Sequence, residues 1–561
     1  MKKLSFVFLI VLFGMQSCHY RPFLKYYFPS KKTHLAKFSK WEQHIGSPSN
    51  PLRACYDVTC YDWLVSVHPE KKSINGLMKI YFRMDLAQDS LMLDLQTHLK
   101  IDGVKSSVSL KKWKRKKDVL FFVFDRNLQK GESAVIEIAY HGTPVSLLGE
   151  SAINWKKDKN NKAWVCSATE GIGPHHMMPC KMLLNDEPDS CFIRVAVPKD
   201  LVAVANGKLD GITETGTEKI YNWSVKNPIN IYNISFNTGD YVKLEKDYKD
   251  INNIDRKIYV YALSYNKTVA DTFYDQAPVM MKNFERLYGP YPWWNDECKF
   301  IESCLPNSAM EHQSAISMGE GYVYNHRKIN VTLAHELSHE WWGNNITGYD
   351  YADIWLHEGF ASYSEFLMAE AIYGKKDYDL FARYYSKNVR NKRPVLKPYN
   401  VVYDSWVHDE DQDIYDKGAM LLHTLRMQLD QDELFFKVLK NAQVKFAKSN
   451  ITVAQFISYF NAETKTDFTP YFDLYLKQLS PPELEYRIDK TDAETAVLNY
   501  RWAKELTPGF SMKVIADVGD TPMVIYPTDK WQQLKFPAKE VLSFDIAKFG
   551  YVLLKVAGSK S

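Results

Sequence analysis

Apolar and polar residues alternate along much of the first half of the chain, which is the pattern of β-strands with one buried face. The clearest example is residues 78–84, where every second residue is apolar, shortly after an Asn75-Gly76 pair that predicts a turn. Further strands are expected within residues 119–124, 134–140, 191–197 and 202–204. The pattern predicts an N-terminal β domain over residues 51–245.

Helical periodicity replaces this alternation after about residue 245. Gly343 and Gly374 are expected to end helices, because glycine readily adopts the conformation that terminates them. A Ser-Pro-Pro sequence ending at residue 482 marks a boundary, and short alternating segments follow it. We therefore expect a mostly helical domain over residues 246–480 and a small C-terminal β-sandwich over residues 481–561.

The chain starts with a short basic stretch and about a dozen mostly apolar residues, which is the length of a signal peptide and too short to span a bilayer. This run ends on Met15-Gln16-Ser17-Cys18, which resembles a bacterial lipobox. It predicts a lipoprotein signal peptide over residues 1–17, a lipid anchor on Cys18 and a tether over residues 18–50. The expected location is the bacterial cell envelope, facing the periplasm or the cell surface. An ordinary signal peptide with a coincidental cysteine is the alternative.

Composition narrows the class of protein. A chain of 561 residues with 45% hydrophobic and 25% charged residues is typical of soluble globular proteins, not of disordered, collagen-like or polytopic membrane proteins. The net charge of +4 gives no general support for binding nucleic acid, and no nucleic-acid partner is expected. The most basic run, residues 111–117, is expected to be a solvated hairpin tip, with contact to anionic lipids as the alternative.

The cysteines do not form a recognisable disulfide framework. Eight are present, seven of them after residue 18, and they are scattered. Cys298 and Cys304 bracket a strand-like stretch that would hold them about 20 Å apart, beyond disulfide reach, if it is extended. The same argument weakens a Cys55–Cys60 pair, and the sequence leaves the disulfide status open.

The segment His335-Glu336-Leu337-Ser338-His339 has the spacing of a metal site. On a helix, His335 and His339 lie one turn apart on the same face, and Glu336 can reach a metal-activated water without coordinating the ion. Zinc hydrolases need a third protein ligand and keep the fourth position for water. Eighteen residues separate His339 from Glu358, which lies near the expected start of a second helix that returns the chain to the histidine face.

Four segments carry a family resemblance: residues 335–344 (HELSHEWWGN), 355–361 (WLHEGFA), 415–419 (YDKGA) and 308–312 (SAMEH). They resemble the gluzincin zinc aminopeptidases, which include aminopeptidase N and leukotriene hydrolase. The resemblance implies a multidomain α+β fold with an N-terminal β-sheet domain, a thermolysin-like and mostly helical zinc domain, and a small C-terminal β-sandwich. The large helical C-terminal domain of many members is not expected here. The resemblance further implies one Zn²⁺ and peptide substrates with free N-termini.

The resemblance also implies roles for individual residues. His335, His339 and Glu358 take the places of the zinc ligands, and Glu336 that of the general base. Tyr415 takes the place of the tyrosine that stabilises the tetrahedral oxyanion.

Substrate recognition is implied by the same comparison. Glu311 takes the place of the carboxylate that binds the α-amino group of the substrate, and Glu170 that of a second amine anchor from the β domain. Ala309 and Met310 are expected on an edge strand that pairs with the substrate backbone.

The sequence departs from the family pattern at three positions: Ser308 replaces a glycine, and His312 and His357 each replace an asparagine. These changes leave the metal ligands and the base intact, and they affect the fine geometry of substrate docking.

Other interpretations remain open. One is a zinc endopeptidase, in which Glu311 contacts something other than a terminal amine. Another is a catalytically silent, surface-anchored binding protein. His175, His176 and Cys180 lie close together, but adjacent histidines point in different directions from any regular element, which disfavours a second metal site.

Overall fold

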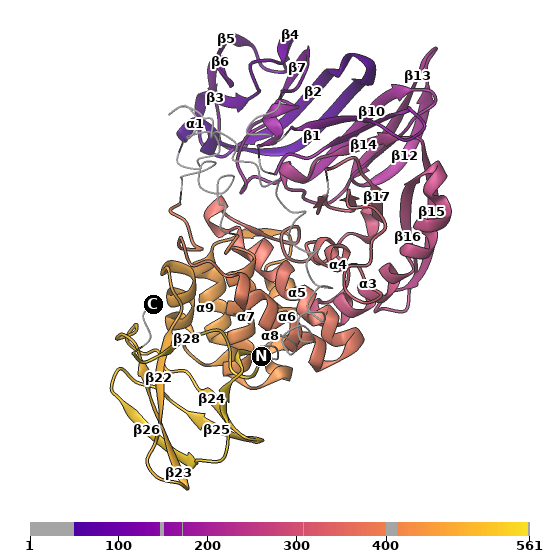
Figure 1. Cartoon of the computed structure of the whole chain (residues 1–561). Coiled ribbons are helices and arrows are strands. Elements are labelled where there is room, and N and C mark those ends of the chain that lie inside the picture. Colours follow the sequence, from indigo (N-terminus) through magenta and orange to yellow (C-terminus); the bar gives the residue numbers. More distant parts are fainter. Residues whose placement is uncertain (1–49, 146–150, 171, 307, 400–411, 559–561) are drawn as a thin grey trace, which may run out of the picture.

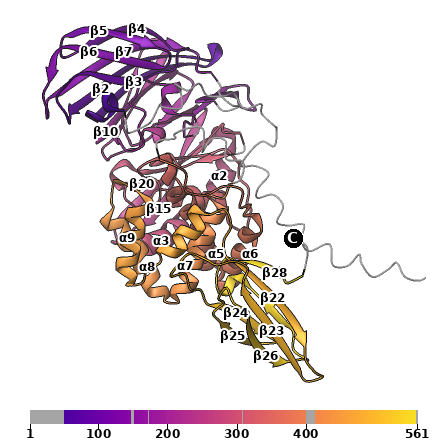
Figure 2. The same ribbon diagram turned by 90° about the vertical axis from the view of Figure 1, so that its left-hand side faces the viewer.

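The computed structural model describes residues 50–145, 151–170, 172–306, 308–399 and 412–558. Figure 1 shows three parts in chain order: a β domain at one end, a helical domain in the middle, and a small β domain at the other end. Figure 2 shows the same succession after a quarter turn. The predicted signal peptide, Cys18 and most of the tether lie outside the described residues.

The N-terminal domain contains three β-sheets. The largest has the strand order β12-β13-β10-β1-β2-β7-β4 and comprises β1 Tyr56–His68, β2 Ser73–Met84, β4 Lys100–Ser106, β7 Ser133–Gly142, β10 Ser190–Pro198, β12 Lys208–Glu214 and β13 Glu218–Val225. A three-stranded sheet comprises β3 Gln88–Asp94, β6 Val119–Leu128 and β5 Leu110–Lys116. A four-stranded sheet comprises β11 Val202–Ala205, β14 Phe236–Gly239, β9 Ala163–Ser167 and β8 Ile153–Lys157. A short helix, α1 (Pro51–Ala54), precedes β1. The alternating segments are confirmed as strands.

Gly76 lies inside β2, so the expectation of a turn at Asn75-Gly76 is wrong. The chain reverses earlier, at Lys72, whose backbone is left-handed (φ 49°). Glycine is needed at position 76 because the ring of Tyr140 covers it, and a Cβ atom there would lie 2.2 Å from Cε1 of that ring. The Tyr140 hydroxyl donates to the carbonyl oxygen of Met177 (2.8 Å) and accepts a hydrogen bond from Trp63 Nε1 (2.9 Å), which fixes the ring in place. The glycine therefore serves packing between strands.

The basic run forms a strand rather than a hairpin tip. Most of it is β5, which among the described strands pairs with β6 alone at the edge of its sheet, and the turn consists of Lys117 and Asp118. Exposed lysines on an edge strand discourage pairing with another chain. The lysines therefore protect the edge of this sheet, a role that the periodicity of the sequence did not indicate.

The central domain combines a five-stranded sheet with helices. The sheet has the order β15-β16-β17-β19-β18 and comprises β15 Tyr241–Lys249, β16 Asp255–Leu263, β17 Cys298–Glu302, β18 Ala309–Met310 and β19 Ala315–Met318. The helices are α2 Lys267–Phe273, α3 Gln276–Tyr288, α4 Val331–Ser338, α5 Trp355–Tyr373, α6 Lys375–Asn388, α7 Asp416–Leu429, α8 Asp432–Lys445, α9 Val453–Thr464 and α10 Thr469–Phe472. Two short strands, β20 (Ile346–Gly348) and β21 (Ser449–Ile451), pair with each other. The expected boundary at residue 245 falls inside β15, so this part of the chain starts a few residues earlier.

The C-terminal part consists of two small sheets. One comprises β26 Gln532–Pro537, β23 Thr495–Trp502, β22 Glu483–Lys490 and β28 Leu553–Val556, and the other comprises β25 Thr521–Ile525, β24 Val514–Val518 and β27 Leu542–Phe544. The first strand starts directly after the Ser-Pro-Pro boundary. The multidomain α+β class is thereby confirmed. Within the described residues, no helix combines the length and apolar character needed to cross a membrane.

Candidate active site

The site is built on α4, a helix whose eight residues are all buried. The side chain of Asn330 caps it by accepting a hydrogen bond from the backbone N–H of Leu333 at 2.6 Å. The helix ends at Ser338, earlier than the predicted stop near Gly343, but His339 retains helical angles (φ −61°, ψ −21°). The rings of His335 and His339 therefore lie on one face, with centroids 4.9 Å apart.

Glu358 completes a three-residue ligand set. It lies in the first turn of α5, and its Oε2 atom is 3.3 Å from His335 Nε2 and 3.5 Å from His339 Nε2. Ligand atoms of the three residues lie within 4.8 Å of one another, and all three side chains are buried. Two imidazoles and one carboxylate are the donors that zinc takes in hydrolytic sites.

Both imidazoles are oriented by hydrogen bonds on their outer nitrogens. His335 Nδ1 is 2.8 Å from Oε1 of Glu365, and His339 Nδ1 is 2.8 Å from the carbonyl oxygen of Trp342. A carbonyl oxygen only accepts, so Nδ1 of His339 carries a proton, and in the neutral imidazole Nε2 is then the nitrogen that can bind a metal. The Tyr385 hydroxyl donates to the other oxygen of Glu365 at 2.6 Å. Such outer partners orient metal-binding histidines, so the residues present fit a zinc ion.

The segment after His339 is fixed by aromatic packing and by a glycine. The rings of Trp342 and Phe360 stack with centroids 3.8 Å apart, which fastens the segment to α5. Gly343 has a φ of 126°, and a Cβ atom there would approach Nδ1 of His339 to 3.1 Å. The glycine leaves room for the hydrogen bond that sets the orientation of this imidazole.

Glu336 lies next to the ligands without being one of the three. A carboxylate oxygen of Glu336 lies within 4.8 Å of ligand atoms of Glu311 and His339. Burial, with Glu311 adding to it and the histidines opposing it, raises the pKa of Glu336 to about 8. A carboxylate with a raised pKa beside a metal site is suited to exchanging protons with water.

The β domain and the helical domain together build a second carboxylate cluster. Oxygens of Glu170, Glu311 and Glu358 lie within 4.8 Å of one another in buried surroundings. The Tyr232 hydroxyl donates to Oε1 of Glu311 at 3.0 Å. Burial is the main reason that the pKa of Glu311 is raised, with Glu358 adding to the effect against His339. Closely spaced carboxylates favour a cation among them.

Ala309 and Met310 form β18, which lies at the edge of the five-stranded sheet. Among the described residues it pairs with β19 alone, and the edge of a sheet is where an extended peptide can add as a further strand. The strand leads directly into Glu311.

Tyr415 lies at the N-terminal end of α7, and its ring stacks on that of His335 with centroids 6.2 Å apart. Burial, followed by the charges of Glu358 and nearby carboxylates, raises the pKa of the Tyr415 hydroxyl well above its usual value. The helices approach closely because Gly359 of α5 faces Gly418 of α7, and a Cβ atom on Gly418 would lie 2.9 Å from the Cα of Gly359. The glycines in two of the sequence motifs therefore bring the tyrosine to the ligands.

The two histidines that replace asparagines act as neutral supports. His357 Nε2 accepts a hydrogen bond from the backbone N–H of Gly348 at 2.8 Å, and burial lowers the pKa of this histidine to about 3. His312 Nδ1 is 3.0 Å from Oγ of Ser317, and burial likewise lowers the pKa of His312 to about 3. The ring of His357 also stacks on that of Tyr232, which holds Glu311.

Sequence reasoning missed three residues that hold the site in shape: Glu365, Tyr232 and Asn344. Asn344 Nδ2 donates to the backbone oxygen of Glu311 at 3.0 Å and to Glu340 Oε2 at 3.1 Å. Asn344 belongs to the HELSHEWWGN segment, so its motif membership was a usable signal. Glu365 and Tyr232 gave no comparable signal, because their partners are distant in sequence.

The neighbouring residues His175, His176 and Cys180 do not form a second metal site of this kind. His176 Nδ1 bonds to Gln96 Nε2 at 3.0 Å, and burial lowers the pKa of His175 to about 3, so these side chains fit a packed interior. Among the described residues, the three-residue clusters with metal-ligand spacing do not include these histidines or Cys180.

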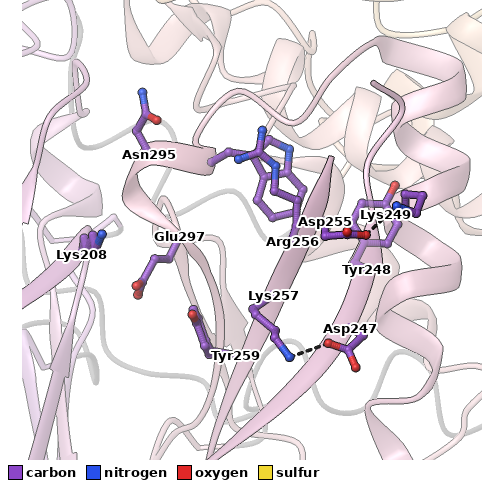
Figure 3. A pocket seen from close by; sticks show the side chains of 11 residues that line it. Lys208, Asp247, Tyr248, Lys249, Asp255, Arg256, Lys257, Tyr259, Asn295 and Glu297 are labelled. Atoms are coloured by element: carbon purple, nitrogen blue, oxygen red, sulfur yellow. Dashed lines mark hydrogen bonds and ion pairs between the residues drawn. The ribbon is translucent and has the colours of Figure 1, made fainter. Parts of the chain in front are cut away.

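A surface pocket of about 810 Å³ lies between β12, the β15–β16 hairpin and the segment before β17 (Figure 3). Its charges partly pair with one another, as in Lys257 with Asp247 and Lys249 with Asp255. It is lined by Lys208, Asp247, Tyr248, Lys249, Asp255, Arg256, Lys257, Tyr259, Trp294, Asn295 and Glu297. None of the predicted site residues lines it.

Comparison with known protein families identifies two matching domain models, and one of them covers most of the helical domain that carries the site. Residues 274–475 match the peptidase family M1 domain, and residues 58–232 match the peptidase M1 N-terminal domain. Together the two matches cover more than half of the chain.

Individual relatives are distant. The chain is 24% identical over 413 residues to leukotriene A-4 hydrolase from Xenopus laevis, covering 67% of this chain and 63% of that protein. It is 23% identical over 420 residues to leucine aminopeptidase 2 from Saccharomyces cerevisiae, covering 71% and 60%. The matched region thus spans less than two thirds of these relatives. An M1 zinc metallopeptidase from Deinococcus radiodurans, solved as a mutant with a Tyr-Ser-Ala substrate, has a TM-score of 0.64 at 20% identity, covering 75% of this chain and 94% of its own.

The role of Glu365 is testable through metal affinity. Glu365→Leu removes the acceptor that orients His335 and should weaken zinc binding by about 10- to 100-fold. Glu365→Gln retains an acceptor oxygen at the same place and should lose less. Competition with a chromogenic chelator measures both variants against the wild type. Unchanged affinity in the leucine variant would contradict the assigned role.

Proposed function

The chain belongs to peptidase family M1, and on that premise we propose that it is a zinc-dependent aminopeptidase that removes N-terminal residues from peptides. The observation that carries the proposal is the position of Glu311 and Glu170 beside Glu358. Carboxylates clustered in a buried space are suited to a cationic group, and the free α-amine of a peptide is such a group.

The expected binding mode starts at the edge of the sheet. A peptide that adds to β18 as an extra strand runs toward Glu311, which follows that strand directly. Glu311 and Glu170 then hold the amine, so the scissile bond lies one residue from the N-terminus and next to the zinc ligands. An endopeptidase would have no use for carboxylates placed to hold a terminal amine beside the zinc ligands.

The chemistry divides among a few side chains. His335, His339 and Glu358 would hold zinc, which supplies a Lewis acid for the peptide carbonyl and lowers the pKa of a water ligand. Glu336, buried beside the ligands, accepts a proton from the attacking water and returns it to the leaving amine. Tyr415 donates a hydrogen bond where negative charge develops on the carbonyl oxygen, a contact of a kind worth about 3 kcal/mol.

For location, we propose export to the bacterial cell envelope, with a lipid on Cys18 as the membrane anchor. The support is the basic start, the short apolar run and the small residue before that cysteine. Peptides outside the cytoplasm would then be the substrates.

The assignment of Glu336 as the base predicts that Glu336→Gln binds about one zinc ion per chain but loses activity by about 100-fold or more. The amide keeps the size of the side chain but cannot accept the proton. Metal analysis and turnover of an aminoacyl-amide substrate measure the two effects separately, and chelation of zinc should abolish wild-type turnover. Wild-type turnover in the metal-loaded variant would refute the assignment.

Exopeptidase character predicts a strong preference for a free N-terminus. Acetylation of a peptide removes the positive charge that compensates Glu311 and leaves the buried carboxylates without a compensating cation, which is costly. A free peptide should be shortened one residue at a time, and its acetylated form should be nearly inert, as followed by mass spectrometry.

Glu311→Ala should narrow the difference in rate between the two peptides by slowing cleavage of the free peptide. The matched control is Glu245→Ala on the exposed face of β15, which should leave the difference unchanged. Internal cleavage of the acetylated peptide at a comparable rate would favour an endopeptidase. Absence of turnover with any peptide by the zinc-loaded protein would favour a silent binding protein.

The anchor is tested by Cys18→Ala, which should move the protein from the membrane fraction to the soluble fraction after cell lysis. A variant that still sediments with membranes and resists high salt would refute Cys18 as the anchor.

A further inference from the structure

Cys166 and Cys304 belong to different domains and meet in the buried interface between them. Cys166 lies in β9 of the N-terminal domain, and Cys304 lies two residues after β17 in the central domain. Their Sγ atoms are 2.9 Å apart, and both side chains have an exposed fraction of 0%. We propose that these two cysteines form an interdomain disulfide when the chain folds in an oxidising compartment.

The surrounding contacts hold the two sulfurs together. Trp164 Nε1 donates to the hydroxyl oxygen of Tyr241 at 3.0 Å, and that hydroxyl donates to the backbone oxygen of Glu302 at 2.7 Å. The residues two positions before each cysteine are thus linked through one tyrosine. A covalent S–S bond is about 2.05 Å long, so the sulfurs need to approach by less than about 1 Å. Among the described residues, no other two cysteine sulfurs lie within hydrogen-bond distance of each other.

The bond forms by thiol–disulfide exchange. The oxidant is a disulfide, either of a small thiol such as glutathione or of a thiol oxidoreductase. The thiolate of Cys166 attacks it and releases one thiol, and the thiolate of Cys304 then attacks the mixed disulfide and releases the second thiol. The two cysteines lose two protons and two electrons in total, and the oxidant receives both. Because the sulfurs are buried in the folded protein, exchange takes place before the two domains complete their docking.

The crosslink would fasten the segments that carry the proposed amine anchors. Cys166 precedes Glu170 by four residues, and Cys304 precedes Glu311 by seven. These two carboxylates come from different domains, so their separation depends on how firmly the domains are joined. The disulfide depends on the proposed export and not on the proposed activity.

The test is peptide mapping of the full chain without reduction. Protein purified from the cell envelope is denatured, alkylated and digested with trypsin. Cleavage after Lys162, Lys181, Lys299 and Arg327 yields peptides 163–181 and 300–327, which separate Cys304 from Cys298. The expected result is a crosslinked pair of these peptides that disappears on reduction, with fragment ions that assign the bond to Cys166 and not to Cys180.

Two variants serve as controls. Cys304→Ser should abolish the crosslinked pair, and Cys298→Ser, which changes another buried cysteine at the start of β17, should leave it intact.

A second experiment distinguishes the ability of the two cysteines to pair from the proposed export of the protein. The reduced full-length chain is refolded in a buffer of oxidised and reduced glutathione. Formation of the crosslink there, but not in protein from cells, would uphold the pairing and count against export. Alkylation of both Cys166 and Cys304 after refolding in this buffer would overturn the proposal.

Discussion

Buried negative charge governs the architecture of the site. Glu170, Glu311 and Glu358 bring oxygens within 4.8 Å of one another, and Glu336 lies close to Glu311. Carboxylates at this spacing and depth destabilise the folded protein unless cations compensate them. A metal ion at Glu358 and a substrate amine at Glu311 and Glu170 would supply the compensation from two sides. In this account, the mutual repulsion of these carboxylates is the source of the site's selectivity for a divalent cation and a protonated amine.

That arrangement depends on both domains holding their positions. Three asparagines of the N-terminal domain bond to the segment that follows Glu311: Asn206 donates to the backbone oxygen of residue 313 at 2.7 Å, Asn233 accepts from the backbone N–H of residue 313 at 3.0 Å, and Asn237 donates to Oγ of residue 317 at 2.9 Å. Each bond is buried, so the loss of one partner would cost about 1–3 kcal/mol. Polar contacts of this kind fix one geometry, which suits an interface that must place carboxylates from two domains.

The sequence predicted several of the strands and the common face of His335 and His339, because both follow from local periodicity. Alternation marked β2, and the four-residue spacing placed His335 and His339 on one face. The errors have a tertiary cause: Gly76 is glycine because of a ring on β7, and residues 111–117 are held in a strand by β6. Glu365 and Tyr232 were missed because their partners lie 30 and 79 residues away, and neither belongs to a local pattern.

The most direct test of the account is anomalous X-ray diffraction at the zinc edge from crystals of the zinc-loaded protein. The account predicts one strong peak per chain at about 2.0–2.2 Å from Nε2 of His335, Nε2 of His339 and a carboxylate oxygen of Glu358. His335 and His339 should retain their Nδ1 partners, the Glu365 carboxylate and the Trp342 carbonyl. A zinc peak bound by other side chains, or none between these three residues, would contradict the account.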